Sequence, residues 1–172
     1  MKIEKPEPGE YTAYTINYIK LLPDDAEVLR HLSENLQTTT DFILSLAPEK
    51  LDYVYAPGKW TIREMWLHVA DSERVFAYRA LCFARGEMQN LPGFEENDFA
   101  ANSNAKTRDI RSILEEFAAV RRATLALFQS FDASVLTKIG TANNNPTSVR
   151  ALAYQIAGHE LHHLNVIKER YL

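Results

Sequence analysis

Four segments of this chain repeat apolar residues at intervals of three and four, the period of an amphipathic α-helix. They cover residues 24–46, 61–85, 107–131 and about 147–172. The stripe of the first segment consists of Leu29, Leu32, Leu36, Thr39, Ile43 and Leu46. No segment shows a convincing two-residue alternation of a β-strand. Four amphipathic helices predict an all-α four-helix bundle, which we expect to form one domain over residues 1–172.

Local signals mark the ends of two of these helices. Thr61 and Glu64 have the spacing of a capping box at the start of the second helix, and Gly86 is a suitable stop. Asn145 followed by Pro146 has the pattern of a cap and a first-turn proline. The sequence therefore predicts that the last helix starts near residue 145 or 147.

The segments between these helices differ in length. Residues 86–106 form a long connection, which could make a hairpin or cross the bundle. We expect residues 137–147 to be loop. Residues 1–23 carry Tyr11, Tyr14 and Tyr18, which favour a short segment packed through its aromatic rings.

Composition excludes several classes of function. The net charge is −4 with both signs mixed along the chain, so no nucleic-acid partner is expected. The chain has no glycine-rich nucleotide loop and no apolar run of membrane-span length. Cys82 is the single cysteine, which rules out an internal disulfide, and the first residues lack the apolar core of a signal peptide. We expect a cytoplasmic protein that acts on small molecules.

The last helical segment contains GHELHHLNVIKERYL, and with it two histidines four residues apart. His159 and His163 share the face that carries Leu152 and Ile156, whereas His162 falls on the polar flank. A single inward histidine is usually a hydrogen-bonded core residue. Burying two without partners would cost roughly 1–3 kcal/mol each, and a metal ion would satisfy both. The pair therefore favours a metal site.

The same residues match H-E-x-x-H, the zinc signature of metalloproteases. The longer form of that signature continues with Gly and His, but Val166 and Glu169 stand at those positions. No strands are predicted for the sheet of such a protease. We therefore interpret the match as coincidental. Glu160 is offset from both histidines and could act only as an outer group or base.

A third ligand is expected on another helix. His68 lies at the margin of the apolar stripe of the second helix, from which it can reach a site between neighbouring helices. His31 lies off the stripe of its helix and is expected to be solvated. Three histidines would leave metal positions open for water or substrate, as in catalytic rather than structural zinc sites.

Other polar groups have structural interpretations. Glu73 falls within the apolar stripe of the second helix and needs a partner, either the metal or an inward arginine such as Arg121 or Arg150. Cys82 is expected to be a small buried hydrophobe. We expect Trp60 and Trp66 to pack at the entrance of the second helix.

Three stretches together resemble the DinB/YfiT-like superfamily of small metalloproteins. They are GKWTIREMWLHVADSERVFAYRAL (residues 58–81), LPGF (91–94) and SVRALAYQIAGHELHHLNVIKERYL (148–172). The resemblance implies a four-helix bundle with a long crossover connection between the second and third helices. It also implies a divalent metal, zinc or nickel, bound by His68, His159 and His163, and a homodimer.

Relatives in this superfamily include S-transferases that use bacillithiol or mycothiol. The resemblance therefore implies a metal-dependent transferase that joins a low-molecular-weight thiol to an electrophile in detoxification or stress response. The alternatives are a metal-dependent hydrolase in which water on the metal attacks, and a non-catalytic dimer that binds metal or ligand. No residue beyond the metal ligands is assigned a catalytic role.

Overall fold

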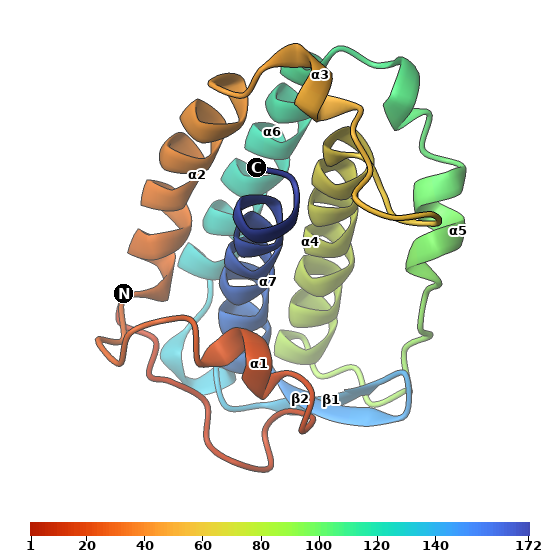
Figure 1. Ribbon diagram of the computed structural model, residues 1–172. Coiled ribbons are helices and arrows are strands. Elements are labelled where there is room, and N and C mark those ends of the chain that lie inside the picture. The colour runs from red at the N-terminus through yellow and green to blue at the C-terminus, as the bar shows by residue number, and fades with distance from the viewer.

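The computed structural model describes residues 1–172 and contains four long helices (Figure 1). These helices are α2 (Val28–Leu44), α4 (Ile62–Ala84), α6 (Ile110–Gln129) and α7 (Val149–Arg170). The short helical elements are α1 (Ile16–Ile19), α3 (Pro48–Leu51), α5 (Glu96–Ala101), η1 (Ala105–Thr107) and η2 (Ala133–Val135). A two-stranded sheet is formed by β1 (Ile139–Ala142) and β2 (Asn145–Ser148). The predicted four-helix bundle is confirmed.

Helices α4 and α6 run parallel, although they follow one another along the chain. Near their starts, Arg63 donates to the carbonyl of Arg108 at 2.8 Å, and further along Arg74 pairs with Glu116 at 2.7 Å. Residues 85–109, which include α5, run back along the outside of the bundle to make this possible (Figure 1). The long connection is therefore a crossover. Helix α4 packs against both α6 and α7, and α2 packs against the same two helices.

The start of α4 forms as its sequence predicts. The Thr61 hydroxyl accepts from the backbone N–H of Glu64 at 3.2 Å, and the Glu64 carboxylate accepts from the N–H of Thr61 at 2.9 Å. The helix ends before Gly86, whose φ of 89° belongs to the left-handed region. This reciprocal cap fixes where α4 begins and so sets which of its residues face α7.

The predicted start of α7 was wrong. Asn145 and Pro146 lie in β2, which pairs with β1 across a turn formed by Asn143 and Asn144. Both turn residues have positive φ, 51° and 61°, the backbone of a type I′ hairpin that asparagine tolerates. The cap is instead Ser148, whose Oγ accepts from the N–H of Ala151 at 3.1 Å. Residues 137–147 were expected to be loop, and the hairpin corrects that prediction.

The N-terminal segment packs across α7 through Tyr18. The Tyr18 side chain is buried, and its backbone lies so close to α7 that a Cβ at Gly158 would come within 2.3 Å of the Tyr18 carbonyl oxygen. Tyr14, by contrast, is 65% exposed. A glycine at 158 therefore lets α1 lie directly over the helix that carries His159.

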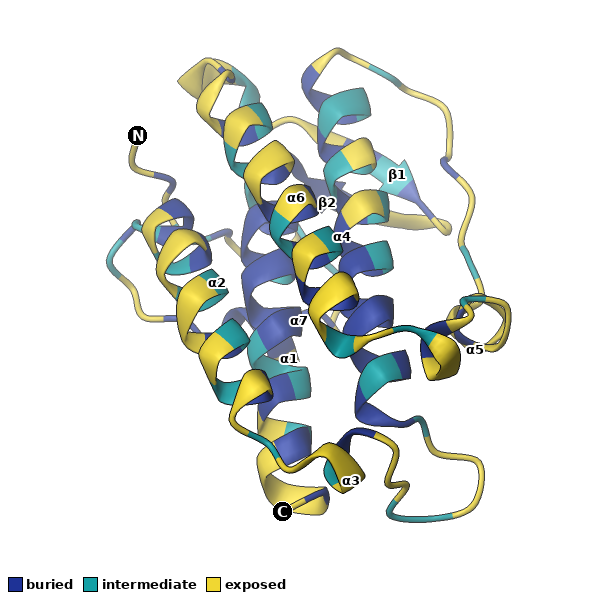
Figure 2. Cartoon of the chain, turned by 90° about the horizontal axis from the view of Figure 1, so that it is seen from above, coloured by how far each residue is buried: buried dark blue, intermediate teal, exposed yellow.

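The four long helices turn their buried residues inward and their exposed residues outward (Figure 2). Helix α4 is the most completely covered, because α6, α7 and the crossover lie around it. Trp66 lies in its second turn with no exposed surface and meets the ring of Phe117 edge-on. None of the helices is long and apolar enough to cross a membrane.

Candidate metal centre

Three histidines meet where α4 and α7 pack together. The Nε2 atom of His159 lies 3.2 Å from that of His68 and 3.0 Å from that of His163. One ligand atom from each of the three residues can be chosen so that all lie within 4.8 Å of one another. The structure therefore brings together the three residues that the sequence predicts as metal ligands.

The spacing of these nitrogens suits a shared metal ion. Two nitrogens about 2.05 Å from a tetrahedral zinc lie about 3.3 Å apart, close to the two distances observed here. The cluster contains no carboxylate or carbonyl that would accept protons from the rings. The Nδ1 atoms of His68 and His163 are buried and have no partner in the protein. Two buried imidazoles and a half-buried one, which converge on one point and lack other acceptors, form a donor set that a cation would satisfy.

Burial keeps these imidazoles neutral. It lowers the pKa of His68 to about 4 and places the pKa values of His159 and His163 well below their usual range. Repulsion from the neighbouring rings lowers the latter two further. A neutral imidazole has the lone pair that a metal requires, so the site is in the ligating form near neutral pH.

Two clefts lie beside the histidine cluster and share His163. The larger has a volume of about 440 Å³ and is lined by all three of them together with Tyr18, Arg79 and Gln155, among others. The smaller, about 260 Å³, has a lining that is half aromatic and apolar, with Tyr55, Met65 and Tyr171 among these residues. Trp60, His162 and His163 line both clefts. A metal held by the three histidines would thus keep positions that small molecules can reach.

Aromatic rings surround the imidazoles. The Trp60 ring lies over His68, with 4.7 Å between centroids, and Tyr18 meets both His159 and His162 edge-on. Phe76 covers His159 from the other side at 5.8 Å. These contacts hold the rings in place and keep water from their faces. Sequence reasoning assigned Trp60 to packing and gave Tyr18 no role at the site.

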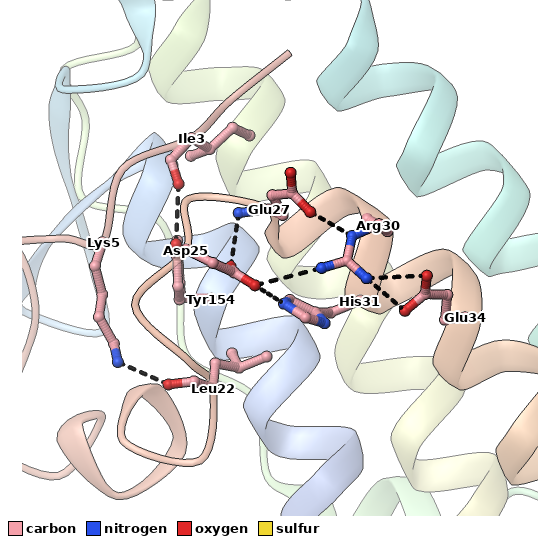
Figure 3. A network of polar contacts seen from close by, with 9 residues as sticks. All are labelled: Ile3, Lys5, Leu22, Asp25, Glu27, Arg30, His31, Glu34 and Tyr154. Carbon is pink, nitrogen blue, oxygen red and sulfur yellow. Dashed lines mark hydrogen bonds and ion pairs between the residues drawn. The ribbon is translucent and has the colours of Figure 1, made fainter.

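Two other histidines differ from their predicted settings. His162, expected on the polar flank, is half-buried and lines both clefts. His31 was expected to be solvated, but its side chain is 17% exposed and its Nε2 lies 2.8 Å from the Asp25 carboxylate (Figure 3). The same carboxylate accepts from the N–H of Glu27, because Ala26 takes a φ of 59° that folds the chain back. His31 therefore belongs to the polar network at the start of α2.

Glu73 has an arginine partner. The Arg121 guanidinium donates to both Glu73 oxygens, at 2.9 Å from Nη2 and 3.0 Å from Nε, and to the carbonyl of Leu32 at 2.8 Å. Nη2 of Arg121 also lies 2.8 Å from Glu160, which accepts from Thr39. The alternative that placed Glu73 beside the metal is therefore wrong, and the predicted ion pair with Arg121 is confirmed.

Arg121 and the two glutamates around it are fully or almost fully buried. Burial lowers the pKa of Arg121, but the two carboxylates outweigh that effect and raise it. Burial also raises the pKa of Glu160, which Arg121 and Thr39 partly offset. Glu160 points into the bundle rather than into the cleft, so it is not placed to act as a base there. Arg150, the other candidate partner of Glu73, pairs with Glu10.

Cys82 was expected to be buried, but it is only partly covered by the apolar core. It does not line the histidine cleft. The single thiol of the chain is therefore not part of the candidate metal centre.

Comparisons with known proteins agree with this architecture. A protein of Oceanobacillus iheyensis named "Putative metal-dependent hydrolase OB0413" is 24% identical over 152 residues, which are 86% of this chain and 85% of the relative. The solved structure of YfiT from Bacillus subtilis, described as "a probable metal-dependent hydrolase with an unusual four-helix bundle topology", matches with a TM-score of 0.69 and 18% identity. That match covers 96% of this chain and 90% of YfiT, and at this identity it shows the shared fold.

A comparison of the sequence with models of protein families identifies the family of this chain. The model of the DinB superfamily matches residues 31–167, which include α4, most of α7 and all three clustered histidines. The matched region is most of the chain and carries both the crossover topology and the candidate metal centre. This chain belongs to the DinB superfamily.

Proposed function

We propose that this chain is a metal-dependent enzyme in which His68, His159 and His163 hold a divalent ion, zinc or nickel. The observation that carries the proposal is the convergence of three neutral imidazoles, two buried and one half-buried, on one cleft that all three line. Three protein ligands leave room for a reactant, which is the arrangement of a catalytic site. The Oceanobacillus protein and YfiT are both described as metal-dependent, which supports the same conclusion.

The residues around the histidines prepare the site for such an ion. A divalent metal would supply Lewis acidity, lowering the pKa of a thiol or water that ligates it. Trp60, Tyr18 and Phe76 pack against the imidazoles and restrict their orientation.

We further propose that the reaction joins two substrates, a low-molecular-weight thiol and an electrophile. Two clefts of different character share His163: one third of the larger cleft's lining residues are hydrophobic, against half of the smaller cleft's. A polar thiol fits the first, and an apolar electrophile fits the second. In the transfer, the sulfur forms a bond to the electrophilic carbon, the leaving group takes the bonding electrons, and the thiol proton passes to solvent. Such chemistry serves detoxification or the response to stress.

Hydrolysis is the second candidate, and the names of the two relatives favour it. In that case water is the nucleophile and one cleft holds the whole substrate. The same three histidines serve both reactions, so the two functions differ in which clefts are used. A thiol requirement distinguishes them.

Metal content tests the ligand set. The purified protein should carry close to one equivalent of metal, and His68→Ala, His159→Ala and His163→Ala should each lose most of it. His31→Ala is the matched control, because His31 lies in a separate network with Asp25. Retention of full metal by the three cluster variants would show that the ligand assignment is wrong.

Activity tests separate the two reactions. The metal-loaded protein should conjugate monochlorobimane to at least one member of a panel of cellular thiols, and removal of metal by chelation should abolish the rate. A hydrolytic rate on ester or amide substrates without any thiol, together with no conjugation across the panel, would favour the hydrolase and exclude the transferase.

A further inference from the structure

Arg79 is a cation in the histidine cleft that has no carboxylate partner. It lies on α4, eleven residues after His68, and lines the same cleft. Its only hydrogen bond runs from Nη2 to the carbonyl of Pro92 at 3.0 Å, although a guanidinium has five N–H donors. Arg121 and Arg150, the other inward arginines considered above, both pair with glutamates. Arg79 is thus left with free donors in a partly covered position.

The surroundings of Arg79 add no compensating negative charge. Burial lowers the pKa of its guanidinium, and no carboxylate counteracts this effect. Glu96 is the acidic residue that lines the cleft, and it forms no ion pair with Arg79. The negative charge of Glu96 instead helps to raise the pKa of Tyr18. The arginine end of the cleft is therefore positive.

The cleft continues past Arg79 toward the β-hairpin. A neighbouring cleft of about 370 Å³ shares Arg79, Tyr14, Asn143 and Gln155 with it. Between the histidines and the guanidinium lies Phe76, whose ring is 5.8 Å from His159 and 6.0 Å from the guanidinium carbon of Arg79. The site thus presents a metal-binding end, an apolar middle and a cationic end along one groove.

The length of this groove follows from helix geometry. Eleven residues of α-helix rise about 16 Å, and an arginine side chain leans back toward the start of its helix, which leaves roughly 10 Å between the guanidinium and the histidine nitrogens. A ligand that touches both ends must therefore be extended rather than compact.

We propose that Arg79 is the substrate-recognition residue of this site and binds the carboxylate of an elongated organic anion whose reacting group lies at the histidines. The inference rests on the proposed function, since it takes the histidines as the metal end. A planar guanidinium with free donors matches the two oxygens of a carboxylate and binds them through parallel hydrogen bonds. Asn143 and Gln155 provide amides for polar groups near that carboxylate.

A purely structural role is the alternative for Arg79, and the experiment must distinguish it from carboxylate recognition. By holding the Pro92 carbonyl it ties the crossover to α4, and this role alone could explain its presence. Loss of that contact would disturb the cleft for every ligand. Loss of carboxylate recognition would affect only ligands that carry the charge at the correct distance.

Cobalt-loaded protein allows ligand binding to be measured without a reaction. A thiol that ligates Co²⁺ produces a sulfur-to-cobalt absorption band, which reports affinity directly. The probes are mercaptopropionate, mercaptohexanoate and mercaptooctanoate, and mercaptooctanol is the neutral match of the longest. We expect mercaptooctanoate to bind about tenfold or more tighter than mercaptooctanol, as one charge-assisted contact implies. The preference over a neutral thiol of equal length should depend on chain length, because the metal–sulfur bond and the carboxylate–guanidinium contact together take up part of the roughly 10 Å.

Substitution identifies the residue. Arg79→Gln should abolish the preference, so that it binds mercaptooctanoate and mercaptooctanol equally, and Arg79→Lys should keep part of the preference. Arg85→Gln is the control for net charge, because Arg85 lies at the end of the same helix, α4, but does not line the cleft. Equal affinities in the wild type, or an equal loss for both probes in Arg79→Gln, would overturn the role of Arg79. Failure of the three histidines to bind cobalt would instead overturn the proposed function and this inference with it.

Discussion

Two buried polar clusters lie side by side in this bundle, and they are satisfied in different ways. In the first, Arg121 and its carboxylate partners Glu73 and Glu160 are joined by close ionic contacts and additional hydrogen bonds. In the second, His68, His159 and His163 face one another and leave two ring nitrogens without partners. The charges of the first cluster are paired within the chain: Glu160 Oε2 has no hydrogen bond but lies 2.8 Å from the Arg121 guanidinium. The second cluster has no such partner for its free ring nitrogens and is complete only when something else binds.

Both clusters draw on the same two helices. Helix α4 supplies His68 and Glu73, and α7 supplies the adjacent residues His159 and Glu160. Consecutive residues on a helix point about 100° apart, so one α7 side chain enters the cleft while the next enters the core. A buried polar group therefore indicates a functional site only when its neighbours fail to satisfy it.

The largest effect is expected from breaking the complete cluster. Arg121→Leu leaves Glu73 and Glu160 buried without a cation and should cost about 3–5 kcal/mol of the free energy of unfolding. Denaturant unfolding followed by circular dichroism measures the loss. Replacing all three residues together by apolar side chains of similar volume should recover most of it. If Arg121→Leu alone is as stable as the wild type, the cluster does not hold the bundle together.

The incomplete cluster should instead make the metal-free protein sensitive to acid. The pKa of His68 is about 4 when folded, and the ordinary value near 6.5 applies to the unfolded chain. The unfolded chain thus binds more protons between these values, so stability falls as pH drops from about 6.5 to 4, by up to roughly 3 kcal/mol for this residue. Unfolding curves across that range in the presence of a chelator test this. A flat profile in the chelated wild type would contradict it, and His68→Leu should flatten part of the slope.

Much of the contrast between the clusters could be read from the sequence, because it depends on local geometry. The spacing of His159 and His163, the offset of Glu160 and the place of Glu73 in its stripe follow from the helical period alone. The capping box at Thr61 sets the same register in the structure. Local periodicity therefore predicts which face a side chain occupies.

What the sequence did not predict depends on segments that are distant along the chain. Tyr18 reaches His159 because α1 folds over Gly158, and Arg79 shares a groove with Asn143 because the hairpin closes that end of the bundle. The hairpin itself had a signal, since two adjacent asparagines suit a type I′ turn, but the proline after them was interpreted as a helix start. The contacts of Trp60 with His68 had no comparable signal, because Trp60 precedes the helix.

Metal addition should convert the incomplete cluster into a stabilising one. Zinc at one hundred times its dissociation constant should raise the free energy of unfolding by about 2.7 kcal/mol, because only the folded chain presents the three nitrogens together. Thermal unfolding with and without zinc measures the shift. His159→Ala should show almost none of it, whereas Arg121→Leu should keep it in full despite its lower baseline. Equal zinc shifts in His159→Ala and the wild type would show that zinc binds elsewhere.

The smallest expected effect is also the one that separates the clusters most directly, because its sign depends on metal. In chelated protein, His68→Leu removes a buried imidazole whose Nδ1 has no partner and should leave stability unchanged or raise it by about 1 kcal/mol. With zinc present the same variant should be less stable than the wild type, because it loses a ligand. Paired denaturant titrations in chelator and in zinc measure both values. A loss of stability in chelator would mean that His68 is satisfied within the chain, and the distinction between the two clusters would fail.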